Sequence, residues 1–391
     1  MVSAPLHAHA GAAFSVSLSL SPASGYMSLV SGGEDDLAVV AEVCCLAPSD
    51  AEDGGDVDEG LGDDEDVRVV CAGEFAAACR RVATLKGHTA EVVRVAHSPF
   101  EKDAVVTMGA DGVAFLWAPP YGANPTPIVK LGPHDEEVYG AHFVDAKTVV
   151  CAAGDRLHMW DIGGGTAACT HAPDPPQDTL NPDKAPDRWA PGYVFDLAVA
   201  SGGPAGAPAL AVAPCSDGRA RVWSVSAASK QLTAIAATPV VTDAHMLSCA
   251  AFVDGTNLAV GTRGGPLYWL DTRMLMHGAV ATSPLPPGGA HHLLVDADRA
   301  SLLASCQDGS VRRVHRDAPE DVDLVVSPLE DQHAVPCHAT ARVQRGDHDL
   351  LFLACGKPSP TGLSCDYGDG LWATELKDSD VGYVRMAAVP R

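Results

Sequence analysis

Basic residues are scarce in this sequence. Its 391 residues include 26 lysines and arginines against 50 aspartates and glutamates, which gives a formal net charge of −24 at pH 7. Proteins that bind a phosphate backbone do so with clustered lysine and arginine side chains, and neutralising those phosphates supplies much of the affinity. This imbalance argues against direct binding of nucleic acid.

Long apolar runs are missing as well. No stretch approaches the roughly 18 apolar residues that a membrane-spanning helix requires. Met1–Gly11 is polar and contains histidine, and Phe14–Leu20 alternates with serine, so neither resembles the apolar part of a secretory signal. We therefore expect no membrane insertion and a cytoplasmic protein, with the nucleus as an alternative location.

Motifs typical of enzymes and metal sites are not found. The serine-hydrolase, metalloprotease and phosphate-loop patterns are absent, and Gly163–Gly165 lacks the strand and helix that a phosphate loop needs. The 12 cysteines include no Cys-x-x-Cys pair, and His333, Cys337 and His338 do not have the spacing of a structural zinc site. We expect no catalytic residues, no cofactor and no metal, with the thiols reduced and buried.

A repeated pattern of short strands is what the chain does contain. Gly87-His88 precedes a strand-like run at 91–97, and a second run leads into the tight turn Asp111-Gly112 and then to Trp117. Similar endings follow at Trp160, Trp223, Trp269 and Val314. The intervals Trp117–Trp160 and Trp223–Trp269 are 43 and 46 residues, close to the roughly 40–45 residues of a four-stranded repeat.

Two further endings complete a set of seven. They are Val67–Val70 near the start of the chain and Trp372 near its end. Longer intervals contain inserts rich in proline, glycine or acidic residues, which we expect to be surface loops. These inserts are 50–66, an acidic stretch expected to be disordered, 173–191 and 357–369. The helix-like stretch Glu74–Arg81 is too short to change this interpretation.

The pattern resembles the WD-repeat family over essentially the whole chain. The resemblance implies an all-β fold, a single seven-bladed β-propeller of four-stranded antiparallel blades formed by residues 1–391. Closure of the propeller stays open at this stage. Phe14–Leu20 could belong to the first blade or be donated to the last, and Val381–Ala388 competes for the outer position of the last blade.

The resemblance also implies a buried hydrogen-bonded set in each blade: a histidine, a hydroxyl, a turn aspartate and a tryptophan. One repeat has the full set, and three have part of it, with Cys151 at one hydroxyl position and Arg263 at one aspartate position. The candidate residues are His88, Thr107, Asp111 and Trp117; His134, Asp155 and Trp160; Ser216, Asp217 and Trp223; and His245, Thr262 and Trp269. We interpret them as structural, because buried polar groups need partners.

The function that follows is a non-catalytic scaffold that binds other proteins, itself monomeric within a larger complex. Tyr121, Trp189 and Tyr367 are candidate partner-binding aromatics in loops. One alternative is a substrate receptor of a cullin-RING ubiquitin ligase, because Trp269-Leu-Asp-Thr-Arg273 approaches the Trp-Asp-x-Arg sequence of such receptors. Another is a binder of basic, histone-like tails through the acidic stretch 50–66.

Overall fold

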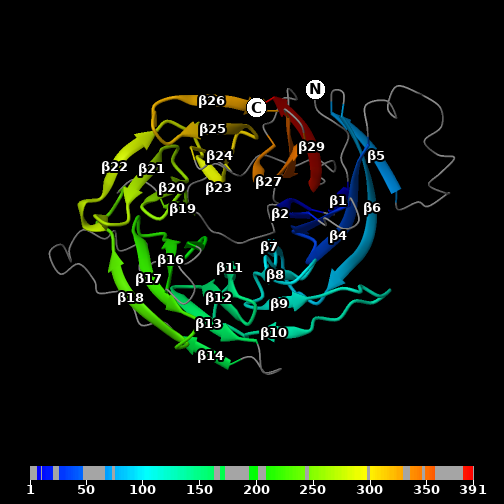
Figure 1. Ribbon diagram of the computed structural model, residues 1–391, viewed down its shortest axis with the longest axis horizontal. Helices are drawn as coiled ribbons and strands as arrows, with labels where there is room; N and C mark the ends of the chain where they lie inside the picture. The colour runs from blue at the N-terminus through cyan, green and yellow to red at the C-terminus, as the bar shows by residue number, and fades with distance from the viewer. Residues whose placement is uncertain are drawn as a thin grey trace. The chain divides into compact units, whose positions relative to one another are not determined.

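The computed structural model is built from β-strands (Figure 1). It describes residues 7–9, 11–20, 26–46, 67–72, 75–162, 168–171, 193–200, 208–242, 246–296, 300–328, 335–345, 348–356 and 382–390. Across these residues the single helical element is a 3-10 turn, η4 (Leu275–His277). The expected inserts at 50–66, 173–191 and 357–369 lie outside the described residues.

The chain divides into two compact units. The first comprises Met1–Thr107, Leu116–Ile128 and His338–Arg391, and the second comprises Met108–Phe115 and Val129–Cys337. The strands form seven sheets, six of four strands and one of five. These sheets are the antiparallel blades of a seven-bladed β-propeller, so the predicted fold class is confirmed.

The five-stranded sheet belongs to the first unit and contains two corrections to the sequence analysis. Its strands are β2 (Ala13–Leu20), β3 (Met27–Gly33), β4 (Leu37–Leu46), β6 (Phe75–Lys86) and β5 (Val67–Ala72), in that order. Val67–Val70 therefore lies in an additional fifth strand, and the third position expected for it is taken by β4.

The stretch Glu74–Arg81 is likewise not helical, because most of it lies in β6. In that strand Ala77, Cys79, Ala83 and Leu85 are buried, which is the two-residue period of a strand with one face in a core. Pairing with β4 along the length of β6 outweighs the high intrinsic helix propensity of alanine.

The first unit also contains, apart from Cys337, the sheet that joins the two ends of the chain. It consists of β27 (Cys337–Arg345), β28 (His348–Cys355), β29 (Gly382–Pro390) and β1 (His7–His9), in the order β1-β29-β28-β27. The alternatives left open by the sequence are thus resolved: Phe14–Leu20 is in the first blade. The segment expected at the outer position is instead the third strand, because β1 pairs with it from His9↔Gly382 to His7↔Val384.

Four sheets lie in the second unit. Their strands are β11 (Val138–Asp145), β12 (Thr148–Ala153), β13 (Arg156–Asp161) and β14 (Ala168–His171); β15 (Ala198–Ala200), β16 (Ala209–Pro214), β17 (Ala220–Ser226) and β18 (Gln231–Ala237); β19 (Leu247–Phe252), β20 (Asn257–Thr262), β21 (Leu267–Asp271) and β22 (Ala279–Ser283); and β23 (Ala290–Val295), β24 (Ser301–Cys306), β25 (Val311–His315) and β26 (Val322–Val326). Within each sheet, consecutive strands are neighbours.

The remaining sheet has residues in both units. It has the order β10-β9-β8-β7, with β7 (Val92–His97), β8 (Val105–Gly109), β9 (Ala114–Trp117) and β10 (Val129–Leu131). Its second and third strands are buried along their whole length, as expected for strands covered on both faces. This sheet contains the repeat that the sequence identifies most clearly.

Candidate functional site

Three Asp-Gly turns fix the position of the aspartate that precedes the third strand of a sheet. Gly112, Gly218 and Gly309 have φ values of 73°, 75° and 81°, a region that favours glycine because it has no Cβ. In each case the preceding aspartate accepts a hydrogen bond from the backbone N–H two residues further on, at 3.1, 3.2 and 2.9 Å. The turn aspartates Asp111, Asp217 and Asp308 therefore fix the entry into the third strand.

The β7–β10 sheet brings His88, Thr107 and Trp117 together. His88 Nε2 lies 2.8 Å from Thr107 Oγ1, and the Trp117 indole N–H donates to the same oxygen at 2.9 Å. Thr107 and Trp117 are 0% and 1% exposed and His88 is 8% exposed, so water cannot substitute for these bonds. One hydroxyl thus joins two side chains from different segments.

The β11–β14 sheet has a shorter version of this arrangement. The Trp160 N–H donates directly to His134 Nε2 at 3.2 Å, and His134 Nδ1 lies 2.9 Å from the carbonyl oxygen of Gly112. An indole N–H can only donate and a carbonyl can only accept, so His134 is the neutral Nδ1–H tautomer. His158 packs edge-on against His134 with ring centroids 4.5 Å apart.

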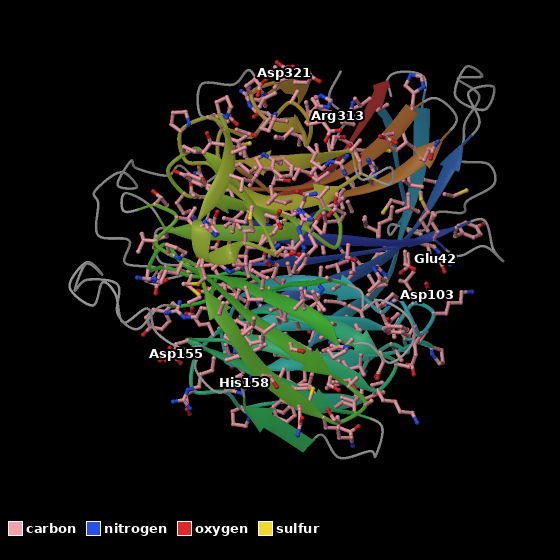
Figure 2. The ribbon with its side chains drawn as sticks, turned by 60° about the vertical axis from the view of Figure 1, so that its left-hand side comes forward. Glu42, Asp103, Asp155, His158, Arg313 and Asp321 are labelled. Carbon is pink, nitrogen blue, oxygen red and sulfur yellow. The ribbon has the colours of Figure 1, made fainter. Side chains whose placement is uncertain are left out.

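Asp155 is not part of that set. Ala153 pairs with Arg156 across a turn of only two residues, Gly154 and Asp155, so the longer Asp-Gly turn of the other sheets has no counterpart here. The Asp155 side chain is 40% exposed and lies 3.5 Å from the Arg156 guanidinium. Figure 2 labels this aspartate, in the turn before β13, and His158, in that strand.

A third polar set, which joins His9 of β1 to the β2–β6 sheet, was missed by the sequence analysis. His9 Nε2 lies 2.8 Å from Ser31 Oγ, and His9 Nδ1 lies 2.9 Å from Asp35 Oδ1. Ala41, which pairs with Leu29, takes the position of the tryptophan. The spacing from Ser31 to Asp35 equals that from Thr107 to Asp111, and this was the signal that could have revealed the set.

A Ser-His-Asp arrangement also occurs in hydrolases, but burial gives this one a structural role. Ser31 and His9 are 0% and 1% exposed. A catalytic serine must reach a substrate carbonyl, and this one is enclosed by packed strands. The three side chains satisfy one another between β1 and the β2–β6 sheet.

The last two predicted sets are incomplete. Trp223 is buried, Ser216 accepts from the Tyr193 backbone N–H at 2.9 Å, and Asp217 forms a bidentate pair with Arg221 at 3.1 and 2.7 Å. In the next sheet the Trp269 N–H donates to Ser283 at 2.9 Å. Thr262 donates to the Pro266 carbonyl instead, at 2.8 Å, and His245 lies outside the described residues.

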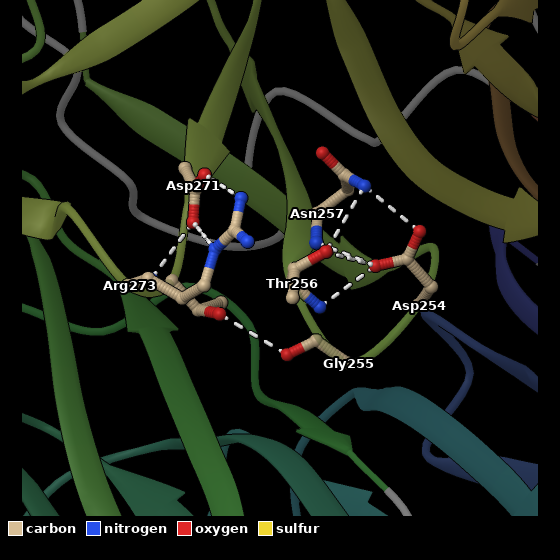
Figure 3. Close-up of polar contacts among 7 residues, drawn as sticks. Asp254, Gly255, Thr256, Asn257, Asp271 and Arg273 are labelled. Carbon is tan, nitrogen blue, oxygen red and sulfur yellow. Dashed lines mark hydrogen bonds and ion pairs between the residues drawn. The ribbon is translucent and has the colours of Figure 1, made fainter.

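Charged side chains gather around the ends of β20 and β21 (Figure 3). Asp254 accepts from the Asn257 side-chain amide at 2.8 Å and from the Thr256 and Asn257 backbone N–H groups at 2.7 and 2.8 Å, and these bonds outweigh desolvation and hold its pKa well below the usual value. Asp271 accepts from the Arg273 Nε and Nη2 groups at 3.0 and 2.6 Å. The Arg273 side chain remains 71% exposed.

The predicted partner-binding aromatics are not brought together. Tyr121 is half-buried, and its hydroxyl donates to the Asp103 carbonyl at 2.7 Å, so the ring packs on its own repeat. Burial raises the pKa of this phenol well above its usual value. Trp189 and Tyr367 lie outside the described residues.

Other site chemistry is limited in the part of the chain that the structure describes. No group of three or more histidine, cysteine or acidic side chains is placed there to hold a metal ion. No helix there is long and apolar enough to span a bilayer. Burial raises the pKa of the Cys215 thiol to about 12, which makes it a poor nucleophile.

Seven antiparallel sheets, one of them with a buried histidine, hydroxyl and tryptophan set and others with part of it, define a β-propeller built from sequence repeats. Residues 79–118 match the family model described as WD domain, G-beta repeat. The matched residues form one repeat, and together with the seven-bladed structure they support a WD-repeat propeller family, with no particular member indicated. Comparison with curated proteins gave no match. Propellers of this family generally bind other proteins and are typically non-catalytic.

Proposed function

We propose that this protein is a non-catalytic scaffold, a WD-repeat subunit that holds other proteins in a multi-protein complex in the cytoplasm or nucleus. The observation that carries the proposal is that the polar sets are buried and mutually bonded. His88, Thr107 and Trp117 use their hydrogen-bonding capacity on one another, as do His9, Ser31 and Asp35. The blades therefore form a rigid frame, and their surface is what partners can bind.

The experiment is affinity purification with chemical cross-linking and mass spectrometry, using the full chain and a deletion of 173–191. We expect a reproducible set of partners, at least one of which is weakened by the deletion while the melting temperature stays unchanged. Recovery of no specific partner would contradict the scaffold proposal. Unfolding of the deletion variant, or survival of every partner, would place the binding surface elsewhere.

The same experiment separates the scaffold from the ubiquitin-ligase alternative. That alternative depends on the segment from Trp269 to Arg273, where Leu270 stands between the tryptophan and Asp271. Recovery of a cullin and its adaptor, lost on Arg273→Gln, would favour a substrate receptor. Recovery of partners without ligase subunits is the result we expect.

A further inference from the structure

The fourth strand β18 contains a bulge beside a buried tryptophan. Ala234 pairs with Trp223 and Ala236 pairs with Val222, so Ile235 is an extra residue between two ladder positions. A bulge bends its strand and changes the direction of the side chains around it. Ile235 is 45% exposed, and Gln231 and Thr233 of the same strand are exposed as well.

The fourth strand of the next sheet repeats the feature. In β22, Ala281 pairs with Trp269 and Ala279 pairs with Leu270, which leaves Val280 as the extra residue. Val280 is 54% exposed. Two successive blades therefore present a large apolar side chain from a bulge in the fourth strand.

The turn η4 adds two methionines to these side chains. Leu275 is 7% exposed and belongs to the core that includes Leu270, whereas Met274 and Met276 on either side of it are 46% and 55% exposed. The turn packs against β18 and ends two residues before β22. Hydrogen bonds from the Met274 N–H to Asp271 O and from the His277 N–H to Met274 O, both 2.9 Å, hold its shape.

We name Ile235, Met274, Met276 and Val280 the β18–β22 patch. Natural edge strands are commonly protected by charged residues, and the edge strand β10 contains Lys130 while β26 contains Asp323. The strands β18 and β22 contain no charged residue. Exposed apolar groups gathered in this way mark interaction surfaces, and methionine adapts its shape to a partner.

The charge next to the patch indicates what kind of partner fits. Arg273 directly precedes Met274, and the segment 272–283 contains this arginine and His277 but no acidic residue, although the chain as a whole has 50 acidic residues. Asp271 orients the guanidinium through Nε and Nη2 and leaves the side chain 71% exposed (Figure 3). An arginine fixed in this way is well suited to receive a carboxylate.

We propose that the β18–β22 patch docks a segment of a partner protein in which large apolar side chains lie beside an aspartate or glutamate. The apolar side chains pack on Met274, Met276 and the two bulge residues, and the carboxylate binds Arg273. A second copy of this chain is disfavoured, because two molecules of net charge −24 repel each other. This inference rests on the proposed scaffold function and names the surface and the partner chemistry.

The test is selection of a displayed random-peptide library on the immobilised full-length protein, followed by fluorescence anisotropy with the enriched peptides. We expect enriched sequences to combine large apolar residues with aspartate or glutamate. Met276→Glu, Val280→Glu and Arg273→Gln should each weaken their binding about tenfold or more. Exposed substitutions of this kind change stability little, and thermal unfolding checks that each variant is folded.

Matched controls lie in the β2–β6 sheet. Val82 is the extra residue of a bulge in β6, where Ala83 pairs with Val40 and Arg81 pairs with Ala41, and it is 36% exposed. Arg80, like Arg273, is exposed and paired with a carboxylate, that of Glu42. Val82→Glu and Arg80→Gln should leave peptide binding unchanged.

Three results would overturn the proposal. They are enrichment of basic peptides only, absence of any peptide whose binding depends on the patch, and a dimer in sedimentation velocity that Met276→Glu dissociates, which would assign the patch to a second copy. If cross-linked partners are recovered but none is affected by the patch variants, the scaffold stands and the patch assignment fails. If no partner is recovered, the scaffold proposal fails whatever the peptides do.

Discussion

Trp117 and Trp160 lie in equivalent third strands, but their indole N–H groups have different acceptors. In the β7–β10 sheet the acceptor is the Thr107 hydroxyl, which also contacts His88. In the β11–β14 sheet, with no hydroxyl at the position of Cys151, the acceptor is His134 itself. The tryptophan stays buried in both sheets, at 1% and 9% exposure.

The comparison shows which part of the polar set is essential. A buried indole N–H requires an acceptor, but the acceptor need not be the same group. Trp269 supports this conclusion, since its N–H donates to Ser283 in the fourth strand. The repeat therefore tolerates the loss of a hydroxyl when another acceptor lies within reach, and the two kinds of sheet should respond differently to substitution.

The largest effect should follow removal of the shared hydroxyl by Thr107→Val. This change keeps the shape of the side chain but leaves both the Trp117 N–H and His88 Nε2 without their partner. We expect a loss of about 3–4 kcal/mol in the free energy of unfolding, because each buried group left unsatisfied costs roughly 1–3 kcal/mol. Urea unfolding measures it, with Thr107→Ser as the control that keeps the hydroxyl. A loss below that of the serine variant would contradict the shared role.

The second largest effect is a dependence of the free energy of unfolding on pH, caused by His97 in the β7–β10 sheet. His97 lies 3.0 Å from both Ser17 Oγ and Ser28 Oγ, and burial lowers its pKa from 6.5 to about 4. The unfolded chain binds this proton more readily, so the stability contribution is complete above pH 6.5 and is lost as the pH falls toward 4. The loss is about 3 kcal/mol.

Urea unfolding across that pH window tests this expectation, with His97→Gln as a variant that cannot titrate. The variant should have a shallower dependence of stability on pH than the wild type. Equal slopes for the two proteins would show that another group is responsible. The comparison is made between slopes because the substitution also changes the absolute stability.

A smaller effect is expected in the sheet without the hydroxyl. Trp160→Phe removes one donor and leaves His134 Nε2 as the only unsatisfied group, so we expect a loss of about 1–2 kcal/mol. Trp117→Phe provides the matched control in the other sheet, where Thr107 can still bond to His88. If Trp160→Phe costs as much as Thr107→Val, the direct contact is as important as the bridged one and the proposed difference is wrong.

The smallest effect should come from Ser283→Ala, at about 1 kcal/mol. The change removes the acceptor of a single group, the Trp269 N–H, and leaves the bond between Thr262 and the Pro266 carbonyl in place. Thermal unfolding is sufficient to measure the change, with Thr262→Ala as the comparison, since Thr262 bonds to the Pro266 carbonyl and not to the tryptophan. A larger loss for Thr262→Ala would restore the assignment made from the sequence.

The periodic features of the chain were predictable because they depend on local sequence. The Asp-Gly turns and the tryptophan intervals predict strands, turns and a seven-bladed propeller, and that fold class is confirmed. The strand order of the first and last blades was harder to predict from the sequence. Val67–Val70 reads like a third strand, but the pairing that places it outside β6 involves residues far apart in the chain.

The acceptors were harder to predict than the donors. Tryptophan positions follow from spacing, whereas the acceptor depends on strand register and turn length. The two-residue turn at Asp155 shifts the register, and no single-sequence pattern reveals that Ser283 faces Trp269. His9 was overlooked because Met1–Gly11 was read as a polar terminus, although it contains the histidine of the first blade.

The short strand β1 has a consequence for how the protein is made. Its pairing with Gly382–Val384 joins residues more than 370 positions apart, and the same strand supplies His9 to Ser31 and Asp35. Contacts of such high sequence separation form late in folding. During synthesis β1 and the β2–β6 sheet therefore emerge from the ribosome before β29, the partner of β1, has been translated. Until nearly all of the protein has been translated, β1 lacks its partner and the β2–β6 sheet is open to aggregation.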